Sequence, residues 1–469
     1  MTKIYDAVVV GGGIVGSAIF RDLSLHNLNT LLIDKYDFSS QTSHRSSKML
    51  HGGIRYLENL DFELISEALS EKNLWIKLAP HLCYESPFYL PIFKNSKQSL
   101  WKISIGLKVY DFLSSFNNTP HKILNKKTTI TNFKNLKSNN LTGAGLYYDG
   151  IVNDSKLNLE VIYDGLFNTN SKAQNYTEIT GVEYHNDHYK LSLLDTLTLK
   201  KSTVISKELI FATGPFTDQL LSKFIPSIWH NCLLPSKGIH LWIDKEKFNI
   251  DYSLVMIDKQ GRLIFIIPHE NAILVGTTET EVKENFFNIE ANNDEKVYLL
   301  NQVNEYFPSL NLNESSIISS FAGVRPLVME NPNQSRENTA RNHKYFQPFS
   351  NMHVIVGGKY TTFRTMGQEI SRTIIERNNI AYSSLKSIQK LRQISTVIQY
   401  KKGSINKEKI IQILKNEYVK TFSDLIIRRL GISNKNGWNE EISFNQYFIE
   451  LLPVLNQFIK VTESDIIEF

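Results

Sequence analysis

The sequence predicts an α/β fold that begins with a βαβ unit of a parallel sheet. Residues 7–10 form a short, apolar and β-branched run, as in a strand that is buried on both faces. The pattern G-x-G-x-x-G follows it directly, at Gly11, Gly13 and Gly16. A second apolar run, residues 31–33, ends at Asp34. Strand, glycine turn, helix, strand and acid in this order predict a dinucleotide-binding unit.

Each part of this unit has a physical role. The first glycine permits a tight turn, the second lets the backbone approach a pyrophosphate, and the third lets helix and strand pack closely. Ile14, Ala18 and Leu23 continue as a helix, whose first amides would face the phosphates. Asp34 stands where a ribose-binding acid is expected. The alternative is an empty Rossmann-like unit, because glycines also serve ordinary turns.

Composition places the chain among ordinary globular proteins. A length of 469 residues allows two or three domains, and 42% hydrophobic residues can form a sizeable core. Two cysteines, Cys83 and Cys232, give neither a disulfide framework nor metal-ligand spacing, so we expect a reducing compartment and no metal. We see no signal peptide and no run near the ~20 apolar residues of a membrane helix. A net charge of +5 permits anionic substrates or lipid headgroups. We expect no nucleic-acid partner.

The loop after Asp34 is rich in hydroxyl groups. It carries Thr42, Ser43, Ser46 and Ser47, followed by Lys48. A solvated loop with a helix cap would explain these residues. Met49, Leu50 and Ile54 are interleaved with the polar groups, however, and Gly52-Gly53 suits close approach to a flat ligand. A loop in this position is placed to run along the cofactor.

Later segments extend the α/β pattern. Residues 62–78 have the spacing of an amphipathic helix, and residues 85–145 read as an insertion. A helix follows residue 153, with Asp154 or Ser155 as its N-cap. Further strands are expected at residues 178–183, 189–194, 208–214, 233–243, 262–268, 272–279 and 354–356. The pair 262–268 and 272–279 predicts a hairpin, and the last strand leads through a glycine turn into a helix that ends near Ile375.

The segment His51-Gly-Gly-Ile-Arg-Tyr-Leu-Glu58, with Ser46-Ser-Lys48, resembles the FAD-dependent glycerol-3-phosphate dehydrogenases of the glycine and D-amino-acid oxidase superfamily. The resemblance continues through Phe321-Ala-Gly-Val-Arg-Pro-Leu327 and Val354-Ile-Val-Gly-Gly-Lys359, and covers residues 4–385. A weaker echo lies at Arg428-Arg429. Lys156 stands where the family usually has arginine, and Glu279 where it more often has aspartate.

This resemblance implies a three-part architecture. A Rossmann-like FAD-binding domain of glutathione-reductase type would take residues 1–84, 146–215 and 345–385. An inserted antiparallel-sheet substrate domain would take residues 85–145 and 216–344. A short C-terminal helical domain would take residues 386–469. The residues expected to bind FAD are Gly11, Gly13, Gly16, Asp34, Thr42, Ser43, Ser46, Ser47, Lys48, His51, Gly52, Gly214, Gly358 and Thr361.

The resemblance also implies a reaction. It is the oxidation of sn-glycerol 3-phosphate to dihydroxyacetone phosphate by hydride transfer to flavin N5, with the electrons passed to a quinone. His240 is the candidate general base, and Arg325 and Lys359 are the other catalytic candidates. The substrate-binding candidates are Arg55, Tyr56, His240, Arg325, Arg341 and Lys359. The structural alternatives are a core histidine at position 240 and a buried ion pair at position 325.

Three other functions remain open. They are a glycerol-3-phosphate oxidase that uses O2 and forms H2O2, an amine or amino-acid oxidase, and a non-catalytic flavin-fold protein. Residues 407–419 have one apolar face among lysines, which predicts either a small helical domain on the body or a membrane-surface helix. We expect a cytoplasmic protein that can sit on the inner face of the cytoplasmic membrane, and a homodimer is compatible with the sequence.

Overall fold

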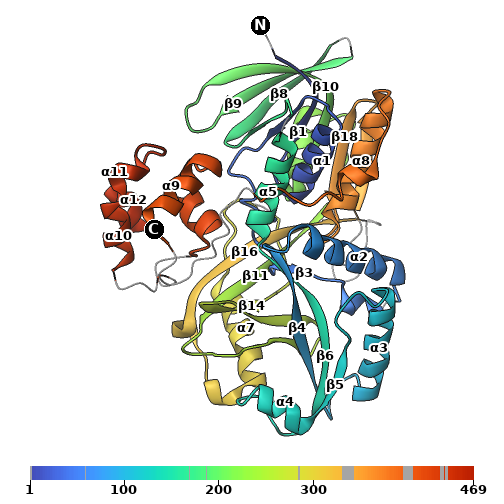
Figure 1. Cartoon of the computed structure of the whole chain (residues 1–469), viewed down its shortest axis with the longest axis vertical. Helices are drawn as coiled ribbons and strands as arrows, with labels where there is room; N and C mark the ends of the chain where they lie inside the picture. The colour runs from blue at the N-terminus through green and yellow to red at the C-terminus, as the bar shows by residue number, and fades with distance from the viewer. Residues whose placement is uncertain are drawn as a thin grey trace.

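The computed structural model describes residues 3–469 except 59, 168, 186, 284–285, 330–342, 394–404, 434–437 and 439–441. The described chain forms two sheets with their helices and a separate helical cluster near the C-terminus (Figure 1). Every helix in these ranges is too short or too polar to cross a bilayer.

The first sheet has the order β17-β18-β10-β1-β2-β7. Its strands from β18 to β7 are parallel neighbours, and β17 joins the edge antiparallel. The hairpin of β8 and β9 joins this sheet through β9, which pairs antiparallel with β10. The bounds are β1 (Lys3–Val10), β2 (Thr30–Ile33), β7 (Lys172–Gln174), β8 (Thr177–His185), β9 (His188–Asp195), β10 (Lys201–Phe211), β17 (His343–Phe349) and β18 (Met352–Gly357). The predicted Rossmann-like sheet is confirmed.

Helices cover one face of this sheet. α1 (Ile14–Leu25) packs between α5 (Asp154–Leu166) and α8 (Phe363–Arg377), and their apolar residues share one core with the inward side chains of β1. The opposite face is covered by the β8–β9 hairpin and α6 (Thr217–Phe224), and the short turn η2 (Gly214–Phe216) leads into α6. The predicted cap of α5 is wrong: Asn153 accepts the Lys156 amide, and Asp154 is the first residue of the helix.

The second sheet is mostly antiparallel, with the order β15-β11-β14-β13-β12-β4-β6-β3, β16 beside β11 and β5 beside β6. The bounds are β3 (Met49–Leu50), β4 (Cys83–Phe93), β5 (Lys122–Asn125), β6 (Leu141–Val152), β11 (Leu233–Asp244), β12 (Ser253–Ile257), β13 (Leu263–Pro268), β14 (Ala272–Gly276), β15 (Thr280–Glu281) and β16 (Ile317–Val328). The predicted hairpin is β13 and β14. β6 spans the expected domain boundary at 145/146 and pairs with β4 along its length, and the domain boundaries stay a prediction.

Two pairs of helices flank the second sheet on opposite sides. α4 (Lys126–Asn132) and α7 (Asn293–Tyr306) contribute to one core, while α2 (Phe62–Leu78) and α3 (Leu100–Leu113) contribute to the other. α2 has the bounds that the apolar spacing predicts. Short helical turns complete this part: η1 (Ile54–Leu57), η3 (Pro308–Leu310) and η4 (Glu314–Ser316). A further turn, η6 (Ser384–Lys386), contacts α1 beside the first sheet.

The C-terminal helical cluster consists of α9 (Lys407–Asn416), the π-helix η7 (Asp424–Leu430), α10 (Phe444–Glu450), α11 (Leu452–Leu455) and α12 (Glu463–Glu468). It has a hydrophobic core of its own and lies beside the first sheet (Figure 1). Ile410, Ile413 and Leu414 of α9 are buried in that core. The apolar face of residues 407–419 is therefore covered by the protein itself and is not available to a membrane.

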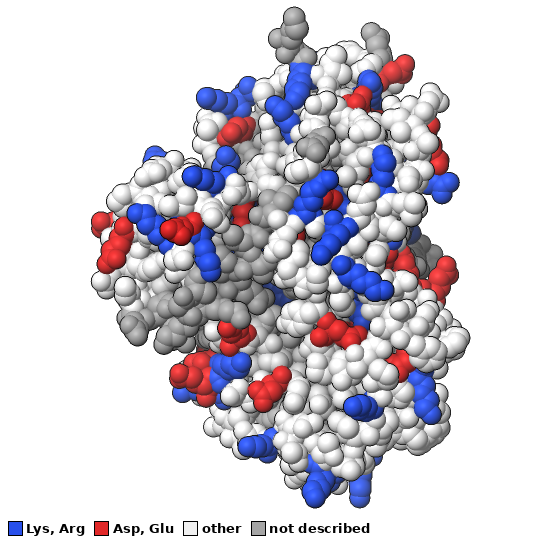
Figure 2. Space-filling model, in the orientation of Figure 1, with Lys and Arg blue, Asp and Glu red and all other residues white. Residues whose placement is uncertain are grey.

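Charged side chains of both signs are scattered over the face shown in Figure 2. Lysine and arginine lie among aspartate and glutamate over the helical cluster and over both sheets. This distribution agrees with the small net charge of +5.

Candidate active site

A cavity of about 730 Å³ lies between the two sheets. Its wall includes the turn from β1 to α1, the loop after β2, η2, parts of β11 and β16, and the turn from β18 to α8. The carboxyl ends of the parallel strands β1, β10 and β18 meet there, which is where open α/β sheets bind ligands. Its volume is in the range of small-molecule sites.

The glycine turn brings backbone against backbone at one end of the cavity. Gly11 has a φ of +107°, and a Cβ on it would lie 2.4 Å from the Ala212 carbonyl oxygen. A Cβ on Gly16 would lie 1.9 Å from the Gly11 carbonyl oxygen, so only glycine fits. Gly13 is the N-cap of α1 and has no capping side chain of its own. The N-terminus of α1, with its positive partial charge, thus lies at the cavity wall.

Asp34 closes this end of the cavity. Its carboxylate accepts the amides of Gly12 at 2.7 Å and Tyr36 at 2.9 Å. Burial raises the pKa of the Asp34 carboxyl to about 7, although both amide hydrogen bonds oppose the shift. An acid held in this way is placed to accept a hydrogen bond from a ribose hydroxyl.

The hydroxyl-rich loop forms a wall of the cavity and is tied to both sheets. The Ser43 hydroxyl oxygen accepts the first amide of α1, from Ile14, at 2.9 Å. The Thr42 hydroxyl donates to the Val324 carbonyl of β16 at 2.7 Å. Predicted cofactor-binding residues that line the cavity are Gly11, Gly13, Asp34, Thr42, Ser43, Ser46, Ser47, His51, Gly214, Gly358 and Thr361.

Three predicted cofactor-binding residues lie behind this wall. Gly16 packs against the glycine turn, as described above. The Lys48 ammonium binds both carboxylate oxygens of Asp154 at 2.9 Å, in a buried ion pair. The Gly52 amide donates to Asp149 at 3.0 Å. These contacts support the site from outside, and a direct contact of these residues with a cofactor stays a prediction.

His240 lies on β11 and faces the cavity, with 3% of its surface exposed. Its Nε2 lies 2.9 Å from the Ser47 hydroxyl oxygen, and its ring stacks on Phe321. Among the described residues, Nδ1 has no hydrogen-bond partner. Burial lowers the pKa of His240 to about 3, and the charges of Arg325 and Lys48 add to the effect. The imidazole is therefore neutral, and it is a weak base in the free protein.

Two cations approach the cavity near His240. The Arg325 guanidinium, on β16, donates to the Thr277 hydroxyl at 2.8 Å and to the Thr278 carbonyl at 3.3 Å. Lys359 follows Gly358, and its ammonium lies 3.8 Å from the ring centroid of Tyr56. Both cations line the cavity.

A smaller pocket of about 80 Å³ adjoins the cavity, and Arg55, Arg262 and Arg325 line it. Asp149 and Glu279 line it too, and burial raises the pKa of Asp149 to about 6. Both spaces share the lining residues His51, Tyr56, Phe265, Thr277 and Arg325. The pocket has room for a few water molecules of about 30 Å³ each, or a small anionic group.

Sequence reasoning missed two residues of this site. Arg262 precedes β13 and reads as an ordinary strand flank. Gly238 lies within β11, where a Cβ would come 2.3 Å from the Arg325 guanidinium. A glycine inside a predicted strand often marks such a close approach, and this signal was available in the sequence. The remaining candidate, Arg341, lies outside the described residues.

Comparison with known proteins identifies the family. Residues 6–359 match the model of the family described as FAD dependent oxidoreductase. The aerobic glycerol-3-phosphate dehydrogenase of Bacillus subtilis (strain 168) is 31% identical over 377 residues, which are 80% of this chain and 67% of the relative. The chain belongs to this oxidoreductase family, and within it to the glycerol-3-phosphate dehydrogenases. The predicted family and the FAD cofactor are confirmed.

Solved structures agree with the fold. The glycerol-3-phosphate dehydrogenase of Bacillus halodurans, complexed with FAD, has a TM-score of 0.68 and 27% identity, covering 83% of this chain and 68% of its own. Glycine oxidase of Geobacillus kaustophilus has a TM-score of 0.61 at 19% identity, covering 84% and 100%. The second match shows the fold alone.

The cavity wall of this flavoprotein fits FAD. The turn at Gly11 and Gly13 carries no side chains and leads into the N-terminus of α1, which suits a pyrophosphate, and Asp34 suits the adenosine ribose. At the other end, Gly357 and Gly358 have φ values of 80° and 79° and lead the chain toward α8. This turn places Lys359 in the wall of the cavity.

Proposed function

We propose that this enzyme oxidises sn-glycerol 3-phosphate to dihydroxyacetone phosphate. The observation that carries the proposal is the arginine-lined pocket, which adjoins the cofactor cavity beside His240 and Lys359. A three-carbon phosphate has few atoms to hold, so its dianion must supply most of the recognition. Each charge-assisted hydrogen bond contributes about 1.5–3 kcal/mol. Arg55, Arg262 and Arg325 would bind the phosphate, with Lys359 on its cofactor side.

His240 is the proposed general base for the C2 hydroxyl. FAD, when bound, supplies the two-electron acceptor for the hydride that leaves C2. The neutral imidazole takes the hydroxyl proton, and Ser47 together with Phe321 fixes its orientation. Burial and the Arg325 charge lower the pKa of His240 in the free protein. A phosphate dianion beside Arg325 offsets that charge and raises the pKa of the base when substrate is present.

Substrate comparison tests the proposal. With an artificial electron acceptor, kcat/KM for glycerol 3-phosphate should exceed that for glycerol by at least about 100-fold, since glycerol lacks the dianion. Glycine and D-amino acids serve as the second comparison. Equal activity with glycerol would contradict the phosphate pocket, and turnover only with amines or amino acids would show an amino-acid oxidase on this scaffold.

We propose a quinone in the bilayer as the electron acceptor, and an exposed apolar face on α3 supports it. Trp101, Ile105 and Phe112 are 63%, 53% and 67% exposed and lie on one side of the helix. Lys102 and Lys108 are exposed beside them. An apolar face with adjacent lysines suits an anionic membrane surface.

This face lies close to the proposed substrate pocket. Leu57 of η1 approaches Gly106 of α3, with 3.8 Å to an added Cβ. The adjacent Tyr56 lines both the cavity and the small pocket. Helix α3 itself and η1 therefore lie between the apolar face and the proposed substrate pocket. The protein would therefore dock on the membrane through α3 and not through α9, whose apolar residues are buried.

Paired acceptor assays test this choice. A short-chain quinone in anionic vesicles should support faster turnover than air-saturated buffer without quinone. Formation of one H2O2 per substrate oxidised, with no stimulation by quinone, would instead identify an oxidase.

A further inference from the structure

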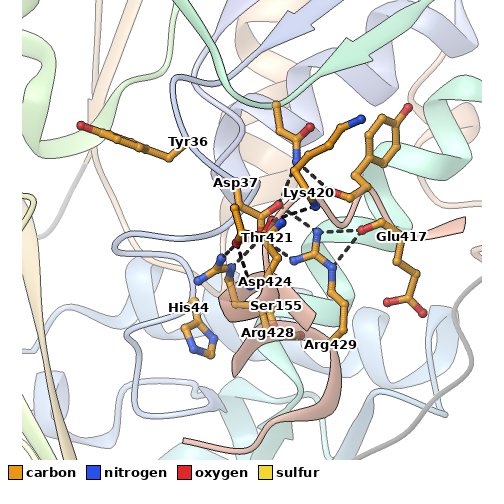
Figure 3. A network of polar contacts seen from close by, with 12 residues as sticks. Tyr36, Asp37, His44, Ser155, Glu417, Lys420, Thr421, Asp424, Arg428 and Arg429 are labelled. Atoms are coloured by element: carbon orange, nitrogen blue, oxygen red, sulfur yellow. Dashed lines mark hydrogen bonds and ion pairs between the residues drawn. The ribbon is translucent and has the colours of Figure 1, made fainter. Parts of the chain in front are cut away.

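The loop after Asp34 is held from behind by the C-terminal helical cluster (Figure 3). Tyr36 lines the cavity, while the neighbouring Asp37 points away from Tyr36 toward two arginines of η7. Asp37 is 1% exposed. Burial alone would raise the pKa of Asp37, but the guanidinium groups of Arg429 and Arg428 lower it, so the carboxylate is charged.

Arg429 binds Asp37 with both terminal nitrogens, and one of these contacts measures 2.8 Å. The same guanidinium donates to the Glu417 carbonyl at 2.9 Å and 2.7 Å, just after the end of α9. Arg429 is fully buried. Its planar guanidinium has five N–H donors and can bind the loop carboxylate and the helical cluster at the same time, which the ammonium group of lysine cannot reproduce.

Arg428 adds a second link to the same carboxylate. Its Nε donates to Asp37 at 2.5 Å, and its Nη2 donates to Asp424. Asp424 accepts the Tyr176 hydroxyl at 2.8 Å and the Thr421 amide at 2.9 Å. The position of Arg428 is thus set on both sides, by η7 and by the segment that precedes β8.

Aromatic packing also connects the C-terminal helical cluster to the glycine turn. The Phe38 ring is fully buried and meets the Tyr418 ring edge-on, with centroids 5.3 Å apart. On its other side, Phe38 lies 2.3 Å from the place where a Cβ on Gly12 would stand. The Ser39 amide then donates to the Gly12 carbonyl at 3.2 Å. One continuous set of contacts joins the C-terminal cluster to the turn that faces the cofactor.

We propose that the C-terminal helical cluster is a clamp for FAD. Arg428, Arg429 and Tyr418 are positioning residues that hold residues 37–39 against the glycine turn. A loop that is ordered before the ligand arrives does not have to lose its freedom on binding, so the clamp tightens FAD binding. Without its partners the loop would carry a buried, uncompensated charge and would leave this position.

Another contact joins the same cluster to the body without touching the loop. The Ser319 hydroxyl of β16 donates to the Ser433 hydroxyl, just after η7, at 2.7 Å. Ser433→Ala removes this contact and leaves no buried charge alone, while Asp37, Arg428, Arg429 and Tyr418 keep their partners. This variant is a matched control, because it weakens the attachment of the cluster at β16 and not at residues 37–39.

The test measures the dissociation constant of FAD with apoprotein of the full chain, and amide hydrogen exchange of residues 36–43. Asp37→Asn should raise the constant at least about tenfold and speed exchange in the loop, with activity recovered by excess FAD. Arg428→Gln should shift both in the same direction by less, because Arg429 remains. The control should stay within about twofold of wild type for FAD.

Two results would overturn the clamp. One is an unchanged FAD affinity in Asp37→Asn and Arg428→Gln while the loop amides exchange faster. The other is a control that loses FAD as strongly as Asp37→Asn, which would show a general loss of stability. If Asp37→Asn fails to fold, as judged by circular dichroism, Arg428→Gln against the control decides the question.

Discussion

The imidazole Nε2 of His240 lies 2.9 Å from the Ser47 hydroxyl oxygen, and this hydrogen bond joins the second sheet to the loop that follows Asp34. It places the proposed base in the wall of the cofactor cavity. The base and the cofactor loop are therefore aligned by one contact between two segments far apart in the chain.

Replacing His240 should slow chemistry and leave FAD bound. His240→Gln keeps a polar side chain but removes the base, and general-base catalysis is worth about 10²–10⁴ in rate. We expect a fall of this size in the rate of anaerobic flavin reduction. Ser47→Ala removes the orienting contact, and with FAD kept saturating it should cost less than about tenfold. A His240→Gln enzyme with a wild-type reduction rate would exclude this histidine as the base.

A substitution of Arg262 tests the phosphate pocket, because the role of Arg262 was inferred from the structure and not from the sequence. Arg262→Ala should raise KM for glycerol 3-phosphate by about 10- to 100-fold, which corresponds to one charge-assisted contact of about 1.5–3 kcal/mol. FAD content should not change. Arg372→Ala is the matched control, since Arg372 is an exposed arginine on α8 that pairs only with Glu376 among the partners that the structure resolves. Steady-state kinetics with both variants decides the point, and equal KM values would remove Arg262 from the pocket.

FAD affinity should rise with pH through the pKa of Asp34, which burial raises to about 7 in the free protein. Below that pH the carboxyl is protonated, and an ionised carboxylate is the better acceptor for a ribose hydroxyl. Binding then releases a proton, so affinity should increase up to about tenfold per pH unit below pH 7 and level off above it. Titration of apoprotein with FAD at several pH values measures this slope. Asp34→Asn should bind more weakly and lose the slope, and a slope retained in that variant would point to another group.

Vesicle binding should depend on α3. Trp101→Ser with Phe112→Ser removes two exposed apolar side chains, each worth about 1.5–3 kcal/mol when buried, and should lower binding to anionic vesicles more than tenfold. Leu199→Ser is the control, because Leu199 is 71% exposed but lies just before β10 of the first sheet. Sedimentation with vesicles gives the bound fraction. Unchanged binding in the double variant would assign docking to another surface.

Local patterns predicted the cofactor half of this protein well. The glycines and Asp34 follow one another along the chain within one βαβ unit, although Gly11 also meets Ala212, which comes much later in the chain. The amphipathic spacing of residues 62–78 likewise gave the bounds of α2. Local patterns did not predict the ion pair between Lys48 and Asp154, because Asp154 belongs to a segment that lies far along the chain.

The substrate half depends on pairing between distant strands, which no local pattern records. Arg262 and Arg325 meet only because β13 and β16 belong to one sheet. The apolar face of residues 407–419 was visible in the sequence, but the core that covers it was not. The exposed apolar face of α3 was not predicted, because it lies within residues 85–145, which the sequence pattern indicated only as an insertion.

Anaerobic mixing of the purified flavoprotein with glycerol 3-phosphate tests the central claim most directly. The account predicts that one equivalent of substrate bleaches the absorbance band of oxidised FAD and yields one dihydroxyacetone phosphate, while glycerol leaves the band unchanged. A flavin that stays oxidised in excess glycerol 3-phosphate would contradict the proposed function.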